Sequence, residues 1–404
     1  MKAISFAAPI PTYLVTLAAG AISPRLLVGP HACTRYADVE TPRLPGERWV
    51  RVRTRLGGIC GSDLAVVTLR ASPATSPFSS FPFVIGHENV GVVDELGAAV
   101  RACVRGDRVV VNPLLSCVPR GIEPTCGACA AGHPSRCDHF TDGALPPGML
   151  IGTTRGLGGS WGECFVAHES QVLRVPPQVS DEEAVLVEPL ACAVHAVRVS
   201  LPAAGDRVLI VGAGSLGLLT LAAVRALAPG AAVTVVARHP FQREHAESLG
   251  ASQVVMTRTA TTAALAEAAG TRLLDTIIGP PAGVGGFSAA FVCATGSRAM
   301  EDAMRFTRAG GTVVLLANAV RLDGLDWTPL WLKELTLRGS LTYGAHAGAG
   351  RGAFAEALEL IAGGGARLRP LVTHTFPLAD YAGALRVAMD KGQSRSVKVA
   401  LRPG

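Results

Sequence analysis

The sequence is poor in the features on which several protein classes depend. Its 404 residues contain only 10 cysteines, too few for a disulfide scaffold, and aromatic residues make up 5%. Charged residues make up 17% and the formal net charge is +6, without the basic blocks or basic–aromatic alternation that bind nucleic acid. No apolar run approaches the roughly 18 uninterrupted residues of a membrane helix. With 49% hydrophobic residues, the chain is predicted to be folded, with neither nucleic-acid nor membrane partners.

The N-terminus only partly imitates a secretory leader. Lys2 precedes an apolar stretch, but Pro9 and Pro11 break that stretch and leave too short an apolar core for a signal peptide. We expect residues 1–6 to form a first β-strand and the protein to be cytoplasmic.

Two sequence patterns follow one another along the chain. Up to about residue 170, short β-like runs alternate with Gly- and Pro-rich turns, which predicts a largely antiparallel, barrel-like domain. From about Asp181, helical periods alternate with Val/Ile/Leu runs, which predicts a parallel doubly wound sheet. We therefore expect a discontinuous domain of residues 1–185 and 342–404, with a nucleotide-binding domain inserted at 186–341. Gly279–Gly286 is interpreted as a loop insertion in that second domain.

A glycine-rich turn indicates the cofactor. The strand-like residues 207–211 lead directly into Gly212-Ala-Gly214-Ser215-Leu216-Gly217, and a helical pattern follows. In this strand–turn–helix context the glycines permit a tight turn and let backbone approach a pyrophosphate at the helix N-terminus. The sequence therefore predicts a dinucleotide site.

The end of the next expected strand bears on which dinucleotide is bound. An acid at that point would accept the ribose hydroxyls of NAD, but here the strand ends in Ala237-Arg238-His239. An arginine without an acid favours the 2′-phosphate of NADP, with NAD still possible. Thr295, at the end of a later strand, is a further cofactor-contact candidate.

Three cysteines have the spacing of a metal site, Cys126-x2-Cys129-x7-Cys137. Structural zinc sites almost always have four protein ligands. Glu123 continues the spacing as the fourth ligand and is favoured for that reason. Cys117, a softer donor further upstream, is the alternative.

A second ligand set is scattered, as expected for loops that meet in one cleft. Cys60, His87 and Glu188 each stand in a turn flanked by Gly or Pro, and catalytic zinc needs three protein ligands and an open position. Glu88, next to His87, is expected to coordinate in turn when the open position is vacated. We therefore predict two zinc ions per chain.

Together these motifs resemble the zinc-dependent medium-chain alcohol dehydrogenase family, particularly its polyol, glucose and threonine dehydrogenase branches. The resemblance rests on Cys60-Gly-Ser-Asp63, Gly86-His87-Glu88, the Cys126–Cys137 lobe, Glu188-Pro189-Leu190 and Gly212–Gly217, and covers nearly the whole chain. It implies a GroES-like catalytic domain and a Rossmann coenzyme domain. It also implies zinc-dependent hydride transfer between a secondary alcohol of a polyol, sugar or amino-alcohol and NAD(P).

The resemblance implies roles and raises alternatives. Ser62 would hydrogen-bond the substrate oxygen, whereas the histidine with which many relatives relay the proton is replaced by Ala65. An NADPH-dependent carbonyl reductase of specialised metabolism, or a non-catalytic nucleotide-binding protein on the same fold, are the alternative functions. A homodimer or homotetramer is expected, and residues 312–316 and their neighbours could pair across subunits.

Some residues are expected to be structural. Asp63 is interpreted as a hydrogen-bonding residue beside Cys60, and Trp327 and Trp331 as packing residues. The Lys and Arg residues near the C-terminus are expected to form a solvated surface.

Overall fold

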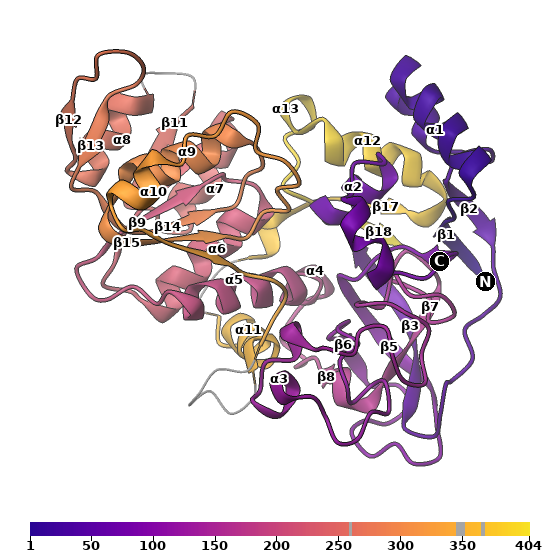
Figure 1. Ribbon diagram of the computed structural model, residues 1–404. Coiled ribbons are helices and arrows are strands. Elements are labelled where there is room, and N and C mark those ends of the chain that lie inside the picture. The colour runs from indigo at the N-terminus through magenta and orange to yellow at the C-terminus, as the bar shows by residue number, and fades with distance from the viewer. Residues whose placement is uncertain (258–260, 345–351, 365–367) are drawn as a thin grey trace. The chain divides into compact units, whose positions relative to one another are not determined.

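The structure is a computed structural model that describes residues 1–257, 261–344, 352–364 and 368–404. The chain forms two compact units (Figure 1). The first comprises Met1–Glu188, Gly344–Gly363 and Leu368–Gly404, and the second Pro189–Tyr343 with Gly364–Arg367. The described part of the chain has no helix long and apolar enough to cross a membrane.

The first unit is built on a seven-stranded sheet whose strand order is β17-β18-β3-β5-β6-β8, with β7 also pairing β3. All pairings are antiparallel except β17–β18. The strands are β3 (Trp49–Gly58), β5 (Asn89–Leu96), β6 (Arg108–Val111), β7 (Cys164–His168), β8 (Val172–Arg174), β17 (Val372–Pro377) and β18 (Lys398–Arg402).

Strand β3 is the centre of this sheet. Its alternation of buried Val50 and Val52 with more exposed arginines gives it one apolar face. One edge pairs with β5 along its length, while the other edge pairs first with β7 and then with β18. The end of β3 therefore lies between the start of β5 and the C-terminal strand.

The N-terminal part adds a three-stranded antiparallel sheet in the order β2-β1-β4. Its strands are β1 (Lys2–Phe6), β2 (Thr34–Asp38) and β4 (Phe83–Val84). Between β1 and β2 the chain forms helix α1 (Ile10–Ile22), which the sequence interpretation missed. Pro11 lies in the first turn of the helix. Backbone N–H groups there have no partner within the helix, so proline costs no hydrogen bond. Proline therefore starts this helix rather than breaking the apolar run.

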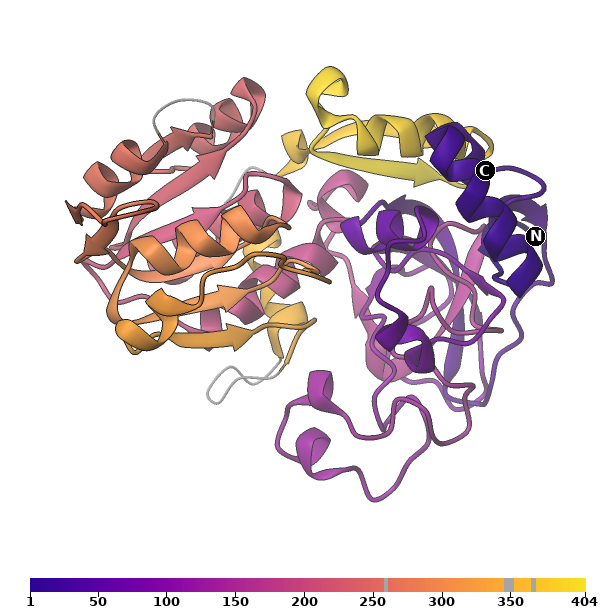
Figure 2. The ribbon, with the colours of Figure 1, turned by 45° about the horizontal axis from the view of Figure 1, so that its top comes forward.

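Short helices complete the first unit. They are α2 (Gly61–Val67), α3 (Gly127–Ala130), α4 (Asp181–Ala184), α11 (Gly352–Ala362), α12 (Tyr381–Met389) and α13 (Lys391–Ser394). Helix α4 begins at a capping box, because the Ser180 hydroxyl accepts from the Glu183 N–H at 3.2 Å and the Glu183 carboxylate accepts from the Ser180 N–H at 3.0 Å. Helix α3 lies in a long lobe that extends away from the strands of its own unit (Figure 2).

The second unit has a six-stranded parallel sheet in the order β11-β10-β9-β14-β15-β16. Counted from β9, this is the 3-2-1-4-5-6 order of doubly wound nucleotide-binding folds. Its strands are β9 (Arg207–Val211), β10 (Ala232–Ala237), β11 (Gln253–Met256), β14 (Phe287–Val292), β15 (Thr307–Leu315) and β16 (Thr336–Gly339). The connecting helices include α6 (Ser215–Leu227), α7 (Pro240–Ser248), α8 (Thr261–Ala269), α9 (Ser297–Phe306) and α10 (Thr328–Leu332), while α5 (Val187–Val199) leads into the unit.

One predicted loop of this unit is partly a strand. Within Gly279–Gly286, residues Ala282–Val284 form β13, which pairs antiparallel with β12 (Arg272–Leu274). Apart from Gly283, which lies within β13, the Gly and Pro residues of this segment flank the strand, so the segment is part of a β-hairpin rather than a loop alone.

Candidate functional site

Sheet register brings the scattered ligand candidates of the first unit to one place. Gly57 pairs with Asn89, and the Gly58 N–H donates to the Glu88 carbonyl at 3.0 Å. The next N–H, that of Ile59, donates to the Val399 carbonyl on the other side at 2.9 Å. Cys60 therefore leaves β3 beside the His87–Glu88 turn and beside β18.

This approach depends on a glycine. A Cβ on Gly58 would lie 2.0 Å from Oε2 of Glu88 and 2.9 Å from its Cβ. Only a residue without a side chain leaves room for that carboxylate against the backbone of β3.

Asp63, in the first turn of α2, links two of the expected ligands. Its Oδ2 accepts from the Cys60 N–H at 2.9 Å, and its Oδ1 lies 3.3 Å from Nδ1 of His87. A carboxylate on Nδ1 leaves Nε2 for a metal, the usual arrangement for a histidine ligand. The Cys60 thiol is also close enough to the His87 imidazole to raise its pKa. Cys60, His87 and their orienting residue thus fit a metal centre.

The electrostatics of His87 reflect these neighbours. Burial lowers the pKa of His87, but the Asp63 carboxylate and the Cys60 thiol raise it more, and the resulting pKa is well above the ordinary value. The Asp63 carboxylate and the Cys60 thiol therefore stabilise positive charge at His87, and such surroundings also favour a bound metal cation.

Glu88 has an ion-pair partner that the sequence did not predict. Both of its carboxylate oxygens accept from Nζ of Lys398, at 2.5 and 2.7 Å, and its side chain is fully buried. The carboxylate is therefore held by an ammonium in this structure, and coordination of zinc by Glu88 stays a prediction.

Lys398 is the functional-site residue that sequence reasoning missed. It was expected on a solvated C-terminal surface, but it is 2% exposed and also donates to the Ile59 carbonyl at 3.3 Å. Burial lowers the pKa of Lys398, and the surrounding anions, chiefly Glu88, outweigh this and raise it. The available signal was a lysine inside the apolar run 397–401, where a solvated residue does not belong.

The remaining catalytic candidates are less closely grouped. Glu188 is buried in the first turn of α5 and contributes to the raised pKa of Lys398. In the described residues, the tight group of three or more metal-type donors, with ligand atoms within 4.8 Å of one another, lies elsewhere, and the role of Glu188 as a ligand beside Cys60 and His87 stays a prediction. Ser62 is half-buried in the first turn of α2, and Ala65 follows in the same helix.

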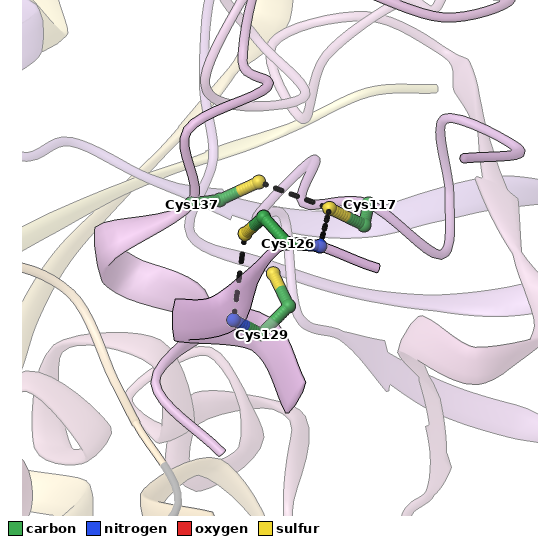
Figure 3. Close-up of side chains that lie close together, drawn as sticks. All are labelled: Cys117, Cys126, Cys129 and Cys137. Atoms are coloured by element: carbon green, nitrogen blue, oxygen red, sulfur yellow. Dashed lines mark hydrogen bonds between the residues drawn. The ribbon is translucent and has the colours of Figure 1, made fainter. Parts of the chain in front are cut away.

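That tight group consists of Cys117, Cys126, Cys129 and Cys137 (Figure 3). The Cys117 and Cys137 sulfurs lie 3.5 Å apart. A tetrahedral zinc with bonds of about 2.3 Å would place its sulfurs roughly 3.8 Å apart, so the donor set fits a closed zinc site with four cysteine ligands.

The fourth member of this group corrects the expectation from spacing. Glu123 is exposed and does not belong to the group, whereas Cys117 is fully buried and does. The three-residue spacing favoured Glu123, but the chain turns between 117 and 122 and brings the earlier thiol inward.

Backbone N–H groups converge on these sulfurs, as on metal-bound thiolates. The N–H of Cys126 donates to the Cys117 sulfur at 3.4 Å, and the N–H of Cys129 donates to the Cys126 sulfur at 3.5 Å (Figure 3). The N–H of His139 donates to the Cys137 sulfur at 3.4 Å. Hydrogen bonds from the Asp138 and Cys129 backbone lower the pKa of Cys126 to about 6, whereas burial raises the pKa of Cys137 to about 11.

In the second unit the glycine turn joins β9 to α6. Gly212 has φ of +107°, and a Cβ on Gly217 would lie 1.8 Å from the Gly212 carbonyl oxygen. Gly214 is the N-cap of α6, and Ser215 and Leu216 form its first turn. The turn lies beside Ala294, which follows β14. From the parallel pair β9 and β14, the chain continues to β10 on one side of the sheet and to β15 on the other. Doubly wound sheets bind dinucleotides at this reversal of strand order.

Three further cofactor candidates lie at the carboxyl ends of neighbouring strands. Arg238 is exposed directly after β10, and in the described residues no carboxylate forms an ion pair with it. His239 caps α7 and stacks on Phe241 with ring centroids 5.6 Å apart. Thr295 is exposed after β14.

Comparison with known proteins gives a consistent assignment. Residues 46–177 match the alcohol dehydrogenase GroES-like domain, and residues 215–363 match the zinc-binding dehydrogenase domain. The chain is 30% identical to L-idonate 5-dehydrogenase of Vitis vinifera, over 82% of this chain and 81% of the relative. It is also 30% identical to sorbitol dehydrogenase of Arabidopsis thaliana, over 82% of each chain.

A solved structure agrees with these relatives. A protein from Sinorhizobium meliloti 1021, described as a zinc-binding dehydrogenase bound to NADP, matches with a TM-score of 0.71 and 25% identity over 92% of this chain and 95% of the other. Its fold, the two matched domains and the relatives' identity lead to one conclusion. The chain belongs to the zinc-dependent medium-chain alcohol dehydrogenase family and is an NAD(P)-dependent oxidoreductase of that family.

Proposed function

We propose that this chain transfers hydride between a secondary alcohol of a polyol, sugar or amino-alcohol and NAD(P), with NADP preferred. The observation that carries the proposal is the Asp63 carboxylate, which fixes the Cys60 backbone and Nδ1 of His87 in one buried arrangement. The relatives named for idonate and sorbitol support the substrate class.

The chain's own residues would divide the work as follows. Cys60 and His87 would hold the catalytic zinc, with Glu188 as the third ligand, and Lys398 would keep Glu88 charged and in place. Ser62 would hydrogen-bond the substrate hydroxyl, the first contact on the proton's way out to solvent. When bound, zinc acts as a Lewis acid toward that hydroxyl, and the nicotinamide accepts the hydride. The first unit, which contains these ligands, is proposed as the catalytic domain, and the second unit, Pro189–Tyr343, as the coenzyme domain.

The coenzyme would bind along the carboxyl ends of β9, β10 and β14. The residues proposed to contact it are Gly212, Gly214, Ser215, Leu216, Gly217, Arg238, His239 and Thr295. The unpaired Arg238 guanidinium supports a 2′-phosphate contact, because arginine binds phosphate through parallel N–H donors.

A homodimer or homotetramer remains part of the proposal, with a change in the strand that would pair. Strand β15 is paired on both sides, by β14 and β16, so residues 312–316 have no free edge. In the described residues, strand β16 is the edge of the sheet and is exposed. Trp327 and Trp331, which precede it, are 45% and 68% exposed, contrary to their expected packing role. We propose β16 as the subunit contact, with Leu337→Glu expected to lower the molar mass by light scattering.

A reducing, cytoplasmic location is proposed from the thiols. The ten cysteines are thiols rather than disulfides in this structure, and four of them form the zinc-type cluster. An oxidising compartment would convert such a cluster to disulfides.

The testing experiment measures metal content, NADP and NAD binding, and oxidation of a polyol panel by the wild type and by Cys60→Ser. We expect two zincs to fall to one, NADP binding to persist, and turnover to disappear. Turnover that survives in Cys60→Ser would refute the catalytic-metal assignment. A wild type that binds NADP but oxidises or reduces no member of the panel would favour the non-catalytic alternative.

A further inference from the structure

Helix α1 is apolar on the side that faces water. The chain has no Asp, Glu, Lys or Arg between Lys2 and Arg25, so the helix has no charged residue. It lies at the periphery of the first unit, next to β1 and β2 (Figures 1 and 2). It also precedes residues 46–177, which match the GroES-like domain, so the fold shared with that family does not account for it.

One narrow side of the helix attaches it to its unit. Thr16 is buried there, and its hydroxyl accepts from the Cys33 N–H at 3.1 Å. Tyr13 packs against the hydrophobic core of the unit, and a Cβ added at Gly20 would lie 2.4 Å from Cδ2 of Leu27. Successive residues of an α-helix are about 100° apart, so Tyr13, Thr16 and Gly20 share one side.

The opposite side is exposed and contains only apolar residues. A surface helix normally has polar residues on its outer side, whereas a helix that is apolar all round is buried. The exposed fractions reach 76% for Ile10 and 83% for Ile22, so this side is not covered by its own unit. The exposed residues, here called the α1 face, are Ile10, Pro11, Leu14, Val15, Leu17, Ala18, Ala21 and Ile22.

The size of the α1 face limits what can cover it. A helix of 13 residues is about 20 Å long and about 10 Å across, so one side of it provides only a few hundred Å². A stable interface buries about 800 Å² on each partner. The α1 face alone is therefore too small to hold a separate protein from dilute solution.

A second copy of this chain overcomes the limit of size. A dimer formed through β16 has two α1 faces, and two such dimers can join through two α1 pairs at once. After the first pair has formed, the second forms within the same assembly and gains from its high effective concentration. Two small contacts then act as one larger interface.

The order of residues on the α1 face also fits a copy of itself. Leu14, Ala18 and Ile22 are spaced four apart and form one row along the helix. When two copies cross antiparallel about a two-fold axis at Ala18, Leu14 of each copy meets Ile22 of the other, and the small Ala18 side chains let the helices approach. A charged residue near such an axis would meet its own like charge, and the α1 face has none.

A membrane surface is the other apolar surroundings to consider. Helices that lie in a membrane interface have Lys and Arg on their polar side and often Trp or Phe on the other. Helix α1 has none of these four residue types, and its one aromatic residue, Tyr13, packs against the core. The composition of the helix therefore favours a protein contact over a lipid contact.

We propose that the α1 face is the contact between two dimers of this chain, which assemble into a tetramer through antiparallel α1 pairs. The inference deepens the proposed function, because it rests on the β16 subunit contact and adds a second contact to it. It gives a role to a helix that lies outside the matched domains.

The test measures the molar mass of the full-length protein by light scattering, and its sedimentation over a range of concentrations. We expect the wild type to have four times the chain mass of 41.6 kDa. Leu14→Lys/Ile22→Lys should halve this mass, because each new lysine meets a lysine of the other copy. Val104→Lys is the control, since Val104 is an exposed apolar residue of the same unit outside α1, and it should leave the mass unchanged.

A second pair of substitutions tests the antiparallel arrangement. Leu14→Glu/Ile22→Lys removes the same two apolar side chains but brings opposite charges together. Its dimers should associate at least about 10-fold more tightly than those of Leu14→Lys/Ile22→Lys. Ala18→Glu, which places like charges at the axis, should also halve the mass and serves as the test should a double variant not fold.

The outcomes distinguish this inference from the proposals on which it rests. A wild type that is a dimer or monomer at all concentrations, or a tetramer that Leu14→Lys/Ile22→Lys leaves intact, would overturn the α1 contact. Equal dissociation of the two double variants would overturn the antiparallel pairing. Binding of the wild type to phosphatidylcholine vesicles, lost in Leu14→Lys/Ile22→Lys, would overturn the assignment to a second copy in favour of a membrane.

Failure of the proposed function gives different results. A tetramer that Leu337→Glu leaves intact would overturn the β16 contact but not the α1 contact. A wild-type tetramer that splits as expected but turns over no polyol or ketone would overturn the catalytic proposal alone.

Discussion

The ammonium of Lys398 lies 2.5 and 2.7 Å from the two carboxylate oxygens of Glu88, and neither side chain is more than 2% exposed. Such a pair is expensive to break from one side, because a buried charge is left without a partner. The pair lies beside Cys60 and His87 and therefore belongs to the surroundings of the proposed catalytic site.

Lys398→Met should therefore lower the free energy of unfolding by about 3–5 kcal/mol, and Glu88→Gln by a comparable amount. The double variant Glu88→Gln/Lys398→Met should recover much of this loss, since it leaves no unpaired charge. Urea unfolding of the four zinc-loaded proteins measures the coupling. Strictly additive losses would show that the two groups are not coupled as described.

Gly58 predicts a sharp steric effect. A Cβ there would lie 2.0 Å from Oε2 of Glu88, whereas one on Gly61 would have no atom within 4 Å. Gly58→Ala should cost about 1–3 kcal/mol of stability and displace the carboxylate from Lys398, while Gly61→Ala should cost little. Unfolding curves, together with the zinc content of each variant, check this, and equal behaviour of the two alanine variants would contradict it.

Glu169 predicts a pH dependence. Its carboxylate accepts from the Arg101 N–H, the Arg48 guanidinium and the Ala102 N–H, at 2.7, 2.6 and 3.0 Å, and these donors lower its pKa from 4.5 to about 2. Because the folded pKa is depressed, the stabilisation is fully present above pH 4.5 and is lost as the pH falls toward 2.

Glu169→Gln should accordingly cost about 2 kcal/mol at pH 7, and the difference from wild type should shrink as the pH is lowered. Comparing the two proteins at each pH cancels the loss of zinc in acid. Asp38→Asn is the control, because its ion pair with Lys2 is exposed and solvent-screened. A difference between Glu169→Gln and wild type that stays constant from pH 7 to pH 3 would exclude this account.

Arg238 predicts coenzyme preference. Arg238→Ala should weaken NADP binding by about 10–100-fold, the value of one or two charge-assisted hydrogen bonds, and leave NAD binding nearly unchanged. Arg243→Ala, an exposed arginine on α7, serves as the control. Titration of each coenzyme by protein fluorescence measures the ratio, and a parallel loss of NADP and NAD would exclude a 2′-phosphate contact.

The parts of the molecule that could be predicted from sequence are those coded locally. The Gly212–Gly217 turn is visible because strand, glycines and helix follow one another, and the structure has β9 and α6 at those places. Cys60 and His87 stand in marked turns. Lys398 carries no local sign of its partner, which is 310 residues away and becomes a neighbour only through the pairing of β3 with β18.

Spacing misled where the chain folds back on itself. Glu123 fits a regular three-residue pattern, yet the turn held by Arg120 brings Cys117 into the cluster. Pro11 was interpreted as a break in the N-terminal apolar stretch, but it lies in the first turn of α1, where proline is tolerated. The first error concerns which residue the fold brings to the cluster, and the second concerns where a helix begins. Both depend on contacts that the spacing of residues in the sequence does not show.

The pairing of β3 with the C-terminal strand has a consequence for biosynthesis. A ribosome adds about 5–20 residues per second, so on the order of 15–60 s separates the synthesis of Glu88 from that of Lys398. The entire parallel-sheet unit emerges in that interval and is free to fold first. Until β18 leaves the exit tunnel, the Glu88 carboxylate has no ammonium partner, and β3 presents half of one edge to any nascent strand nearby.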